Sequence, residues 1–288
     1  DVSGLKNTGT NSYNSSITLP IGTSGANTTI NWDGCILERP TQKNVTTWDT
    51  SATSPQKDMA IDLIPTSSDP TTLWGPRLKD VLYSRSDSNG WTLNPVTTTS
   101  NFSRPTSGST TTACPSPSKL LEVWDPGVFQ TYINNLTTDG YTFHDIGMLW
   151  GARLMSPTGI FAEHNAVAND NVQRHMIFMT DGDTNANSDA LSAYNVPWFD
   201  RLQTDGAPST STLNTLTDQR TAALCTAVKN MNITLWVVSY GSDVNSTTNA
   251  NLQACASPGK FFQYQPGVSL TTQFKQIAGQ IAALRLTT

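Results

Sequence analysis

A ten-residue stretch, residues 174–183, constrains the fold of this chain more than any other. It reads Arg-His-Met-Ile-Phe-Met-Thr-Asp-Gly-Asp, so an uncharged apolar run at residues 176–179 is soon followed by two acidic residues. A short, continuously apolar run is typical of a strand buried on both faces of a parallel sheet. Because ligands of open α/β sheets bind at the carboxyl ends of strands, the sequence predicts a mostly parallel sheet with Asp181 at its rim.

The second half of the chain continues this pattern of apolar runs alternating with helical periodicity. Residues 233–240 and 260–264 predict two further strands. Helices are expected to begin at Asp125, Thr142 and Asp218, to span residues 252–255 and to close the chain over residues 270–284. Thr142 and Asp145 have the spacing of a capping box, and residues 158–173 and 184–216 are expected to be irregular. Alternating strands and helices favour an α/β fold with helices flanking the sheet.

The first half of the chain lacks such regularity. Residues 1–31 are expected to be extended, with one edge strand at residues 17–21. Residues 32–120 are rich in Pro, Ser and Thr and contain widely spaced tryptophans, which predicts an irregular insertion with aromatic anchors. The predicted organisation is therefore an N-terminal segment at residues 1–31, an insertion at residues 32–120 and an α/β domain at residues 121–288.

The low and slightly negative charge of the chain makes some classes of binding partner less expected than others. The chain has 288 residues, of which 14% are charged, and a formal net charge of −5, so nucleic acid is not an expected partner. Ser, Thr, Asn and Gly replace the missing charges and predict a neutral, hydrogen-bonding exterior. Such exteriors are common in exported proteins and in surfaces that pack against copies of themselves.

The four cysteines predict an oxidising compartment. None forms a Cys-x-x-Cys pair, which disfavours zinc, and the even number fits two disulfides. We expect Cys35 to pair with Cys114 and Cys225 with Cys255, each bridge lying within one half of the chain. The alternative is four free buried thiols.

The sequence contains no signal peptide and no apolar run long enough to span a membrane. Because it starts at Asp1 rather than at a methionine, we expect a processed or truncated product.

Three stretches of the sequence carry a resemblance to a known family. The first is Thr-Phe-His-Asp-Ile-Gly-Met-Leu-Trp-Gly-Ala-Arg-Leu at residues 142–154, followed by Ser-Pro-Thr-Gly-Ile-Phe at residues 156–161; the second is the strand and turn at residues 175–182, and the third is the cluster at residues 32–40. They resemble the TadG-like proteins of bacterial tight-adherence (Tad) pilus assembly, which carry a von Willebrand factor A domain, and residues 32–40 resemble the insertion that those proteins place inside the domain. The resemblance covers most of residues 30–285 and implies a von Willebrand A-like, Rossmann-type sheet outside the cytoplasmic membrane.

The resemblance also implies a metal ion-dependent adhesion site at the carboxyl edge of the sheet. Thr142 matches the loop threonine and Asp181 the later aspartate of that site, which would hold Mg²⁺, Mn²⁺ or Ca²⁺. The alternatives are a helix N-cap for Thr142 and plain turn chemistry for Asp181. Asp183 is expected to be a solvated turn residue.

The chain departs from the family at its first strand. The metal motif of the family follows that strand, whereas here Asp1-Val2-Ser3-Gly4 stands at the terminus and is followed by Leu5. Without the first strand, residues 176–179 would have an unpaired edge, which is costly unless covered. We therefore expect another segment in that position: a separate N-terminal fragment, residues 17–21, or a strand of a neighbouring copy.

These observations predict a non-enzymatic adhesion or pilus-assembly module located in the periplasm, at the cell surface or in the medium. Its partner would be another protein, bound through the cation. The alternative is a structural subunit of an extracellular assembly, held by strand complementation. A hydrolase has only Asp181 and Asp183 as a candidate carboxylate pair.

Overall fold

The computed structural model describes residue 5 and residues 12–20, 26–78, 114–138, 140–165, 172–188 and 190–284. The chain divides into two compact units that interleave in the sequence. Unit 1 comprises Asp1–Val45, Pro65–Tyr141 and Asn187–Leu213, and unit 2 comprises Thr46–Ile64, Thr142–Ala186 and Asn214–Thr288. The range 32–120, predicted as one insertion, therefore contributes residues to both units.

Unit 1 contains two small antiparallel ribbons and short helices. Strand β1 (Ser16–Leu19) pairs with β2 (Thr28–Asn31), and β3 (Ile36–Leu37) pairs with β4 (Gly75–Pro76). Helix α1 (Pro126–Asn134) begins as predicted, because the Asp125 carboxylate accepts the N–H groups of Gly127 and Val128. A 3₁₀ helix (Pro70–Thr72) and α4 (Pro197–Asp200) complete its regular structure within the described residues, and the Cys35–Cys114 disulfide lies in this unit.

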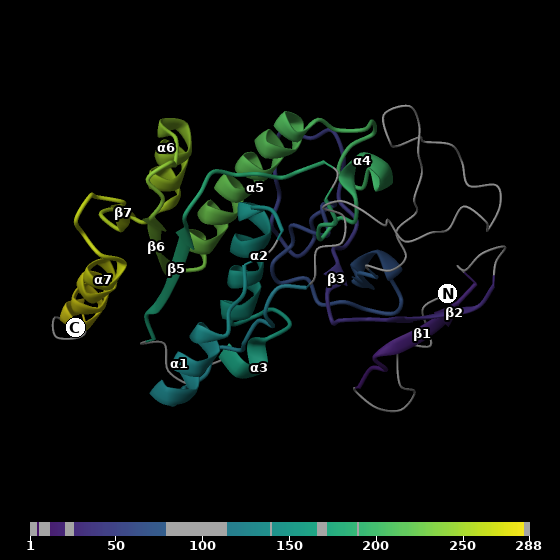
Figure 1. Ribbon diagram of the computed structural model, residues 1–288, viewed down its shortest axis with the longest axis horizontal. Coiled ribbons are helices and arrows are strands. Elements are labelled where there is room, and N and C mark those ends of the chain that lie inside the picture. Colours follow the sequence, from purple (N-terminus) through teal and green to yellow (C-terminus); the bar gives the residue numbers. More distant parts are fainter. Residues whose placement is uncertain are drawn as a thin grey trace. The chain divides into compact units, whose positions relative to one another are not determined.

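Unit 2 is built on a parallel sheet of three strands in the order β5-β6-β7 (Figure 1). Its strands are β5 (Arg174–Thr180), β6 (Ile233–Ser239) and β7 (Phe261–Gln263). Its helices are α2 (His144–Met155), α3 (Ala162–Asn165), α5 (Thr210–Asn230), α6 (Ser246–Cys255) and α7 (Leu270–Leu284), of which α5 begins in unit 1. The α/β class with a parallel sheet is thus confirmed, while its von Willebrand A identity stays an expectation.

Helices cover the two faces of this sheet unequally. One face carries the main core, formed by Met176 and Phe178 of β5, Leu235 and Val237 of β6, and apolar residues of α2, α5 and α6. The Cys225–Cys255 disulfide joins α5 to α6 on this side. On the other face, Trp236 and Val238 of β6 pack against Ile277 of α7.

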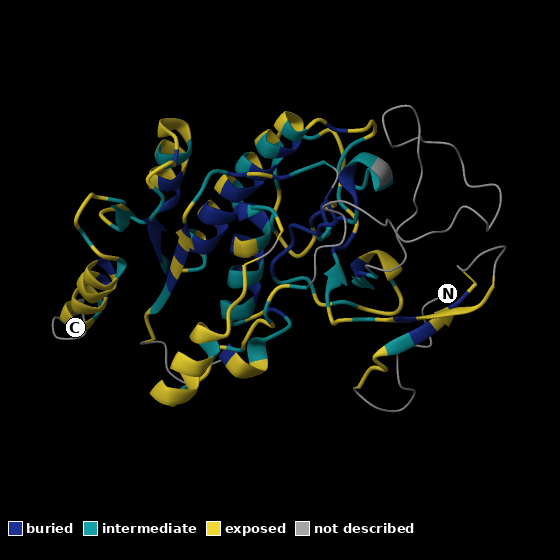
Figure 2. Ribbon diagram, viewed as in Figure 1, coloured by how far each residue is buried: buried dark blue, intermediate teal, exposed yellow. Residues whose placement is uncertain are grey.

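Strand β5 differs from its prediction in two ways. Ile177 and Met179 are 39% and 50% exposed, so the strand is buried on one face only (Figure 2). The physical reason is that α7 packs on β6 and β7 and leaves β5 uncovered. In the described part of the chain no segment pairs with the outer edge of β5, and the strand expected at residues 17–21 pairs with β2 instead. Of the three segments expected beside β5, residues 17–21 are therefore excluded, while a separate N-terminal fragment and a strand of a neighbouring copy stay expectations.

Several predicted boundaries also move. Helix α5 starts at Thr210 rather than at Asp218, because the Ser209 hydroxyl accepts the N–H of Thr212 and caps the earlier turn. Residues 158–173, expected to be a loop, include the single turn of α3. Helix α6 is longer than expected and begins after the N-cap residue Asn245.

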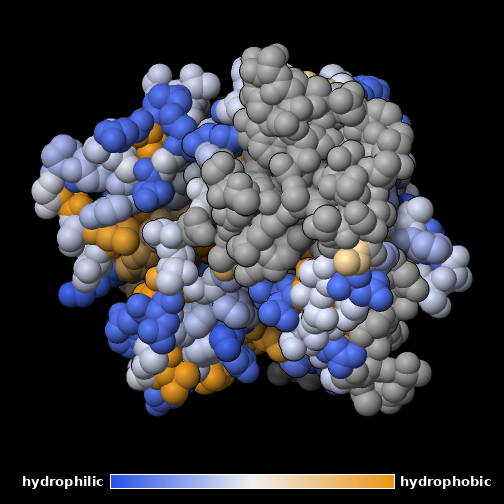
Figure 3. All heavy atoms as spheres, turned by 45° about the vertical axis from the view of Figure 1, so that its right-hand side comes forward, coloured by the Kyte–Doolittle hydropathy of each residue, from blue (hydrophilic) through white to orange (hydrophobic). Residues whose placement is uncertain are grey.

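On the face shown in Figure 3, strongly hydrophilic and weakly polar residues surround separate apolar patches of the described surface. None of the helices within the described residues combines the length and apolarity needed to cross a bilayer. Both predicted disulfides are present, which is compatible with an extracellular protein.

Candidate functional site

The candidate site lies where β5 and β6 end side by side. Thr180 pairs in register with Ser239, and the N–H of Tyr240 donates to the Thr180 carbonyl at 2.9 Å. Beyond the strands the two backbones approach closely, because a Cβ at Gly241 would lie 1.9 Å from the Asp181 carbonyl oxygen. Only glycine fits that position, and this contact fixes the path of the chain at Asp181.

Thr142 reaches the same rim through its backbone. Its N–H donates to the Asn185 carbonyl at 3.1 Å, and the Asn185 N–H donates back at 3.0 Å. This short antiparallel bridge ties the residue before α2 to the turn after β5. The structure thus brings the segments of both predicted metal ligands to one edge of the sheet.

The predicted capping role of Thr142 is wrong. Helix α2 begins at His144 with Phe143 as its N-cap residue, and no side chain caps it. Thr142 is held in the extended bridge to Asn185, one residue too early to cap. The capping box fails as well, because the Asp145 carboxylate accepts the N–H of Ile146 and pairs with Arg220.

The two acidic residues of the turn play different parts. Asp183 accepts the backbone N–H of Asn245 at 3.1 Å and its amide N–H at 2.5 Å, and so fastens the turn to the start of α6. The carboxylate of Asp181 is exposed and accepts no hydrogen bond from the described residues. Asp181 is therefore the carboxylate that remains available to a ligand.

A buried histidine lies behind the rim. Nε2 of His144 is 3.0 Å from the Thr180 hydroxyl, and Nδ1 is 3.0 Å from the Thr184 hydroxyl. The Thr184 hydroxyl in turn donates to Asp218 at 2.5 Å. Burial lowers the pKa of His144, while the nearby carboxylates of Asp218 and Asp183 oppose that shift. The network holds the α2 start, the β5 turn and α5 together.

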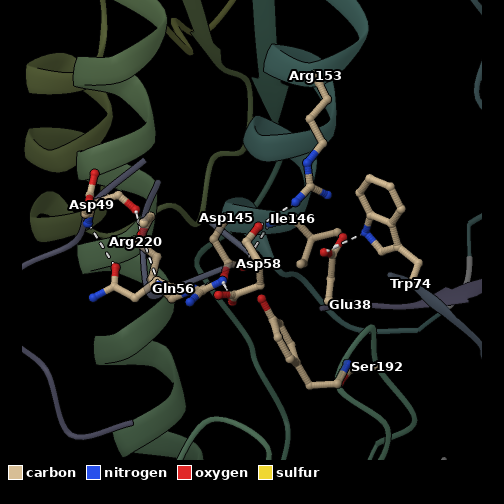
Figure 4. Close-up of polar contacts among 12 residues, drawn as sticks. Glu38, Asp49, Gln56, Asp58, Trp74, Asp145, Ile146, Arg153, Ser192 and Arg220 are labelled. Atoms are coloured by element: carbon tan, nitrogen blue, oxygen red, sulfur yellow. Dashed lines mark hydrogen bonds and ion pairs between the residues drawn. The ribbon is translucent and has the colours of Figure 1, made fainter. Parts of the chain in front are cut away.

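A buried ion cluster joins the start of α2 to α5. Arg220 of α5 contacts Asp145 and Asp58, each at 2.7 Å, and all three side chains are at most 1% exposed (Figure 4). Burial raises the pKa of Asp145, and the adjacent Arg220 guanidinium opposes that rise. Arg153 donates to the Asp58 carbonyl, so residues 46–64 are anchored to α2 as well.

Sequence reasoning missed both buried polar clusters. His144 lies in the motif at residues 142–154 but received no role of its own there, and Asp58 lies in the range 32–120, which was predicted to be irregular. The partners of Arg220 are 75 and 162 residues away, a separation at which no local pattern signals a contact. The one available signal was that Arg220 lies at helical spacing from the apolar residues Leu213, Leu224 and Val228, which indicates a buried partner.

The donors at the rim fit a hard divalent cation in kind. Asp181 offers a carboxylate and Thr142 a hydroxyl, the oxygen ligands that Mg²⁺, Mn²⁺ and Ca²⁺ prefer. They supply two protein ligands, so water or a partner would complete the coordination. Among the described residues, the one group of three close potential ligands is Asp33, Cys35 and Cys114, and its cysteines are consumed by a disulfide.

Searches of protein-family profiles, of curated proteins and of solved structures return no match to this chain.

Proposed function

We propose that this chain is a non-enzymatic, extracytoplasmic adhesion or pilus-assembly module that binds a partner protein through the rim of its parallel sheet. Asp181 and Thr142 would hold a divalent cation, and a carboxylate of the partner would complete its coordination. The observation that supports this proposal is the exposed Asp181 carboxylate at the carboxyl end of β5, beside the bridge that brings Thr142 to the same edge.

The chemistry of this role is electrostatic. A bound cation supplies positive charge that attracts a carboxylate from the partner. The chain itself positions Asp181. The close contact at Gly241 and the Asp183–Asn245 hydrogen bonds fix the backbone around it. With two protein ligands, we expect weak binding, with Kd of about 10⁻⁴–10⁻³ M.

Isothermal titration calorimetry with MgCl₂, MnCl₂ and CaCl₂ tests the cation site. Asp181→Ala should abolish the heat of binding, whereas Asp183→Asn should retain it, because Asp183 is engaged with Asn245. Equal binding to the native protein and to Asp181→Ala would refute the assignment. Retention on carboxylate-coated beads in MnCl₂, with release by EDTA, would test the bridging step.

The second candidate function is a structural subunit held in an extracellular assembly by strand complementation. The outer edge of β5, which pairs with no segment that the structure describes, and its exposed apolar side chains favour this role. Hydrogen–deuterium exchange on material purified from its source tests it. The amides of Ile177 and Met179 should be protected there, and rapid exchange would exclude an added strand.

A further inference from the structure

The outer edge of strand β5 has no partner strand within the described ranges. The strand pairs with β6 along its whole length, and no described segment pairs with its other side. The Thr180 carbonyl bonds toward β6. Because backbone groups of a strand alternate in direction, the N–H and C=O groups of Ile177 and Met179 point to the open edge.

The apolar layer of the sheet continues onto this edge without cover. Trp236 and Val238 of β6 are fully buried under α7, whereas their register neighbours in β5, Ile177 and Met179, are 39% and 50% exposed. Edge strands are usually protected by charges, prolines or bulges. After Arg174 at its start, β5 contains no further Lys, Arg, Asp or Glu and no proline, so its apolar part at residues 176–179 lacks those protecting residues.

The charges at the two ends of β5 indicate what this edge pairs with. Arg174 lies at its start, where its guanidinium also donates to the Asn165 carbonyl at 2.7 Å, and the exposed Asp181 follows its end. An antiparallel copy would set the basic end of one strand against the acidic end of the other, at both ends of the pair. A parallel copy would place like charges together and would not close a two-fold dimer.

We propose that the outer edge of β5 pairs antiparallel with β5 of a second copy of this chain, forming a continuous six-stranded sheet across a two-fold axis. With the axis perpendicular to the sheet, Ile177 and Met179 of both copies share one face and cover part of each other's apolar surface. The inference rests on the second candidate function and names its partner. It does not depend on the cation.

Sedimentation velocity in EDTA, over a range of protein concentrations, tests the dimer. Ile177→Lys should weaken dimerisation by about tenfold or more, because both copies would bring a charge to the shared apolar face. Val128→Lys is the matched control, since Val128 is an exposed apolar residue of α1 (58%) far from β5 in the sequence. Unchanged circular dichroism would show that both variants fold. A native protein that stays monomeric at all concentrations, or equal effects of the two variants, would overturn the proposal.

A charge exchange tests the antiparallel orientation. Arg174→Glu and Asp181→Arg should each fail to dimerise alone, because like charges then meet at both ends. Mixed in equal amounts they should form a heterodimer, since each end again pairs opposite charges. If the mixture stays monomeric while the native protein dimerises, antiparallel β5 pairing is refuted.

The outcomes also separate this proposal from strand complementation in general. Protection of the β5 amides in source material, combined with a monomeric purified chain, would overturn the second copy as the partner. In that case the edge is occupied by another polypeptide, as in the second candidate function, or by residues of this chain outside the described ranges.

Discussion

Replacing Arg220 with methionine should destabilise unit 2 severely. Arg220 is 1% exposed and is the shared partner of Asp58 and Asp145, whose side chains are 0% and 1% exposed. The substitution removes the guanidinium that both buried carboxylates contact. Removing one partner of a buried ion pair costs about 3–5 kcal/mol. For domains of 150–250 residues that corresponds to a fall in Tm of about 6–20 °C.

Urea denaturation followed by tryptophan fluorescence measures this loss. Gln219→Met is the matched control, because Gln219 is the exposed neighbour of Arg220 on α5 and receives the same side chain. Adding Asp58→Asn to Arg220→Met should recover part of the stability, because it removes the charge of one buried carboxylate. A loss below about 1 kcal/mol for Arg220→Met, the size of a surface ion pair, would refute the buried cluster.

The loss should also depend on pH. Burial raises the pKa of Asp145, and removal of Arg220 takes away the charge that opposes this rise. At pH values above 3.8, the ordinary pKa of the carboxyl, Asp145 of the folded variant then holds a proton that the unfolded chain has released. The variant therefore gains stability relative to the native protein as pH falls from neutrality toward 5. A loss independent of pH would contradict the presence of ionised carboxylates.

Three further perturbations test the surroundings of the rim. Gly241→Ala should lower the free energy of unfolding, measured by urea denaturation, by about 1–3 kcal/mol and should weaken cation binding, because the added Cβ would clash with the Asp181 carbonyl. Gly182→Ala is the control and should change neither quantity, because the space around its Cβ is open. Burial lowers the pKa of His144 below 6.5, so the unfolded state binds more protons than the folded state below that pH. The free energy of unfolding, measured in EDTA, should therefore fall as pH drops below 6.5. In His144→Asn the free energy of unfolding should depend less steeply on pH. Replacing both Cys225 and Cys255 with alanine should cost about 3–4 kcal/mol through the lost constraint over their sequence separation of 30, and an unchanged unfolding midpoint would exclude this disulfide from the folded protein.

The parts of the fold that could be predicted are those encoded by local patterns. Apolar runs located β5, β6 and β7, and the Asp125-Pro126 pair located the start of α1. Cysteine positions sufficed for both disulfides because each bridge stays within one half of the chain. Acidic residues after a strand sufficed to place Asp181 at the rim, since the strand direction fixes which end they occupy.

What could not be predicted depends on contacts between distant segments. The apolar run at residues 176–179 indicated burial, but whether a helix covers each face depends on where α7 packs. Through Ile277, α7 packs on Trp236 and Val238 of β6 and leaves the side chains of β5 on that face exposed. Thr142 had the sequence of an N-cap, yet its bridge to Asn185 removed it from that role. The residues that stiffen the rim, His144 and Arg220, were missed because their partners come from other elements.

The most direct test of the proposed function is a crystal structure of this chain grown with MnCl₂ and measured with anomalous scattering from manganese. We expect an anomalous peak at ligand distance from the Asp181 carboxylate, with the Thr142 hydroxyl as a second protein ligand or bound through water, and no peak in Asp181→Ala crystals. An ordered Asp181 without an anomalous peak at millimolar Mn²⁺ would contradict the cation-binding rim and the adhesive role proposed from it.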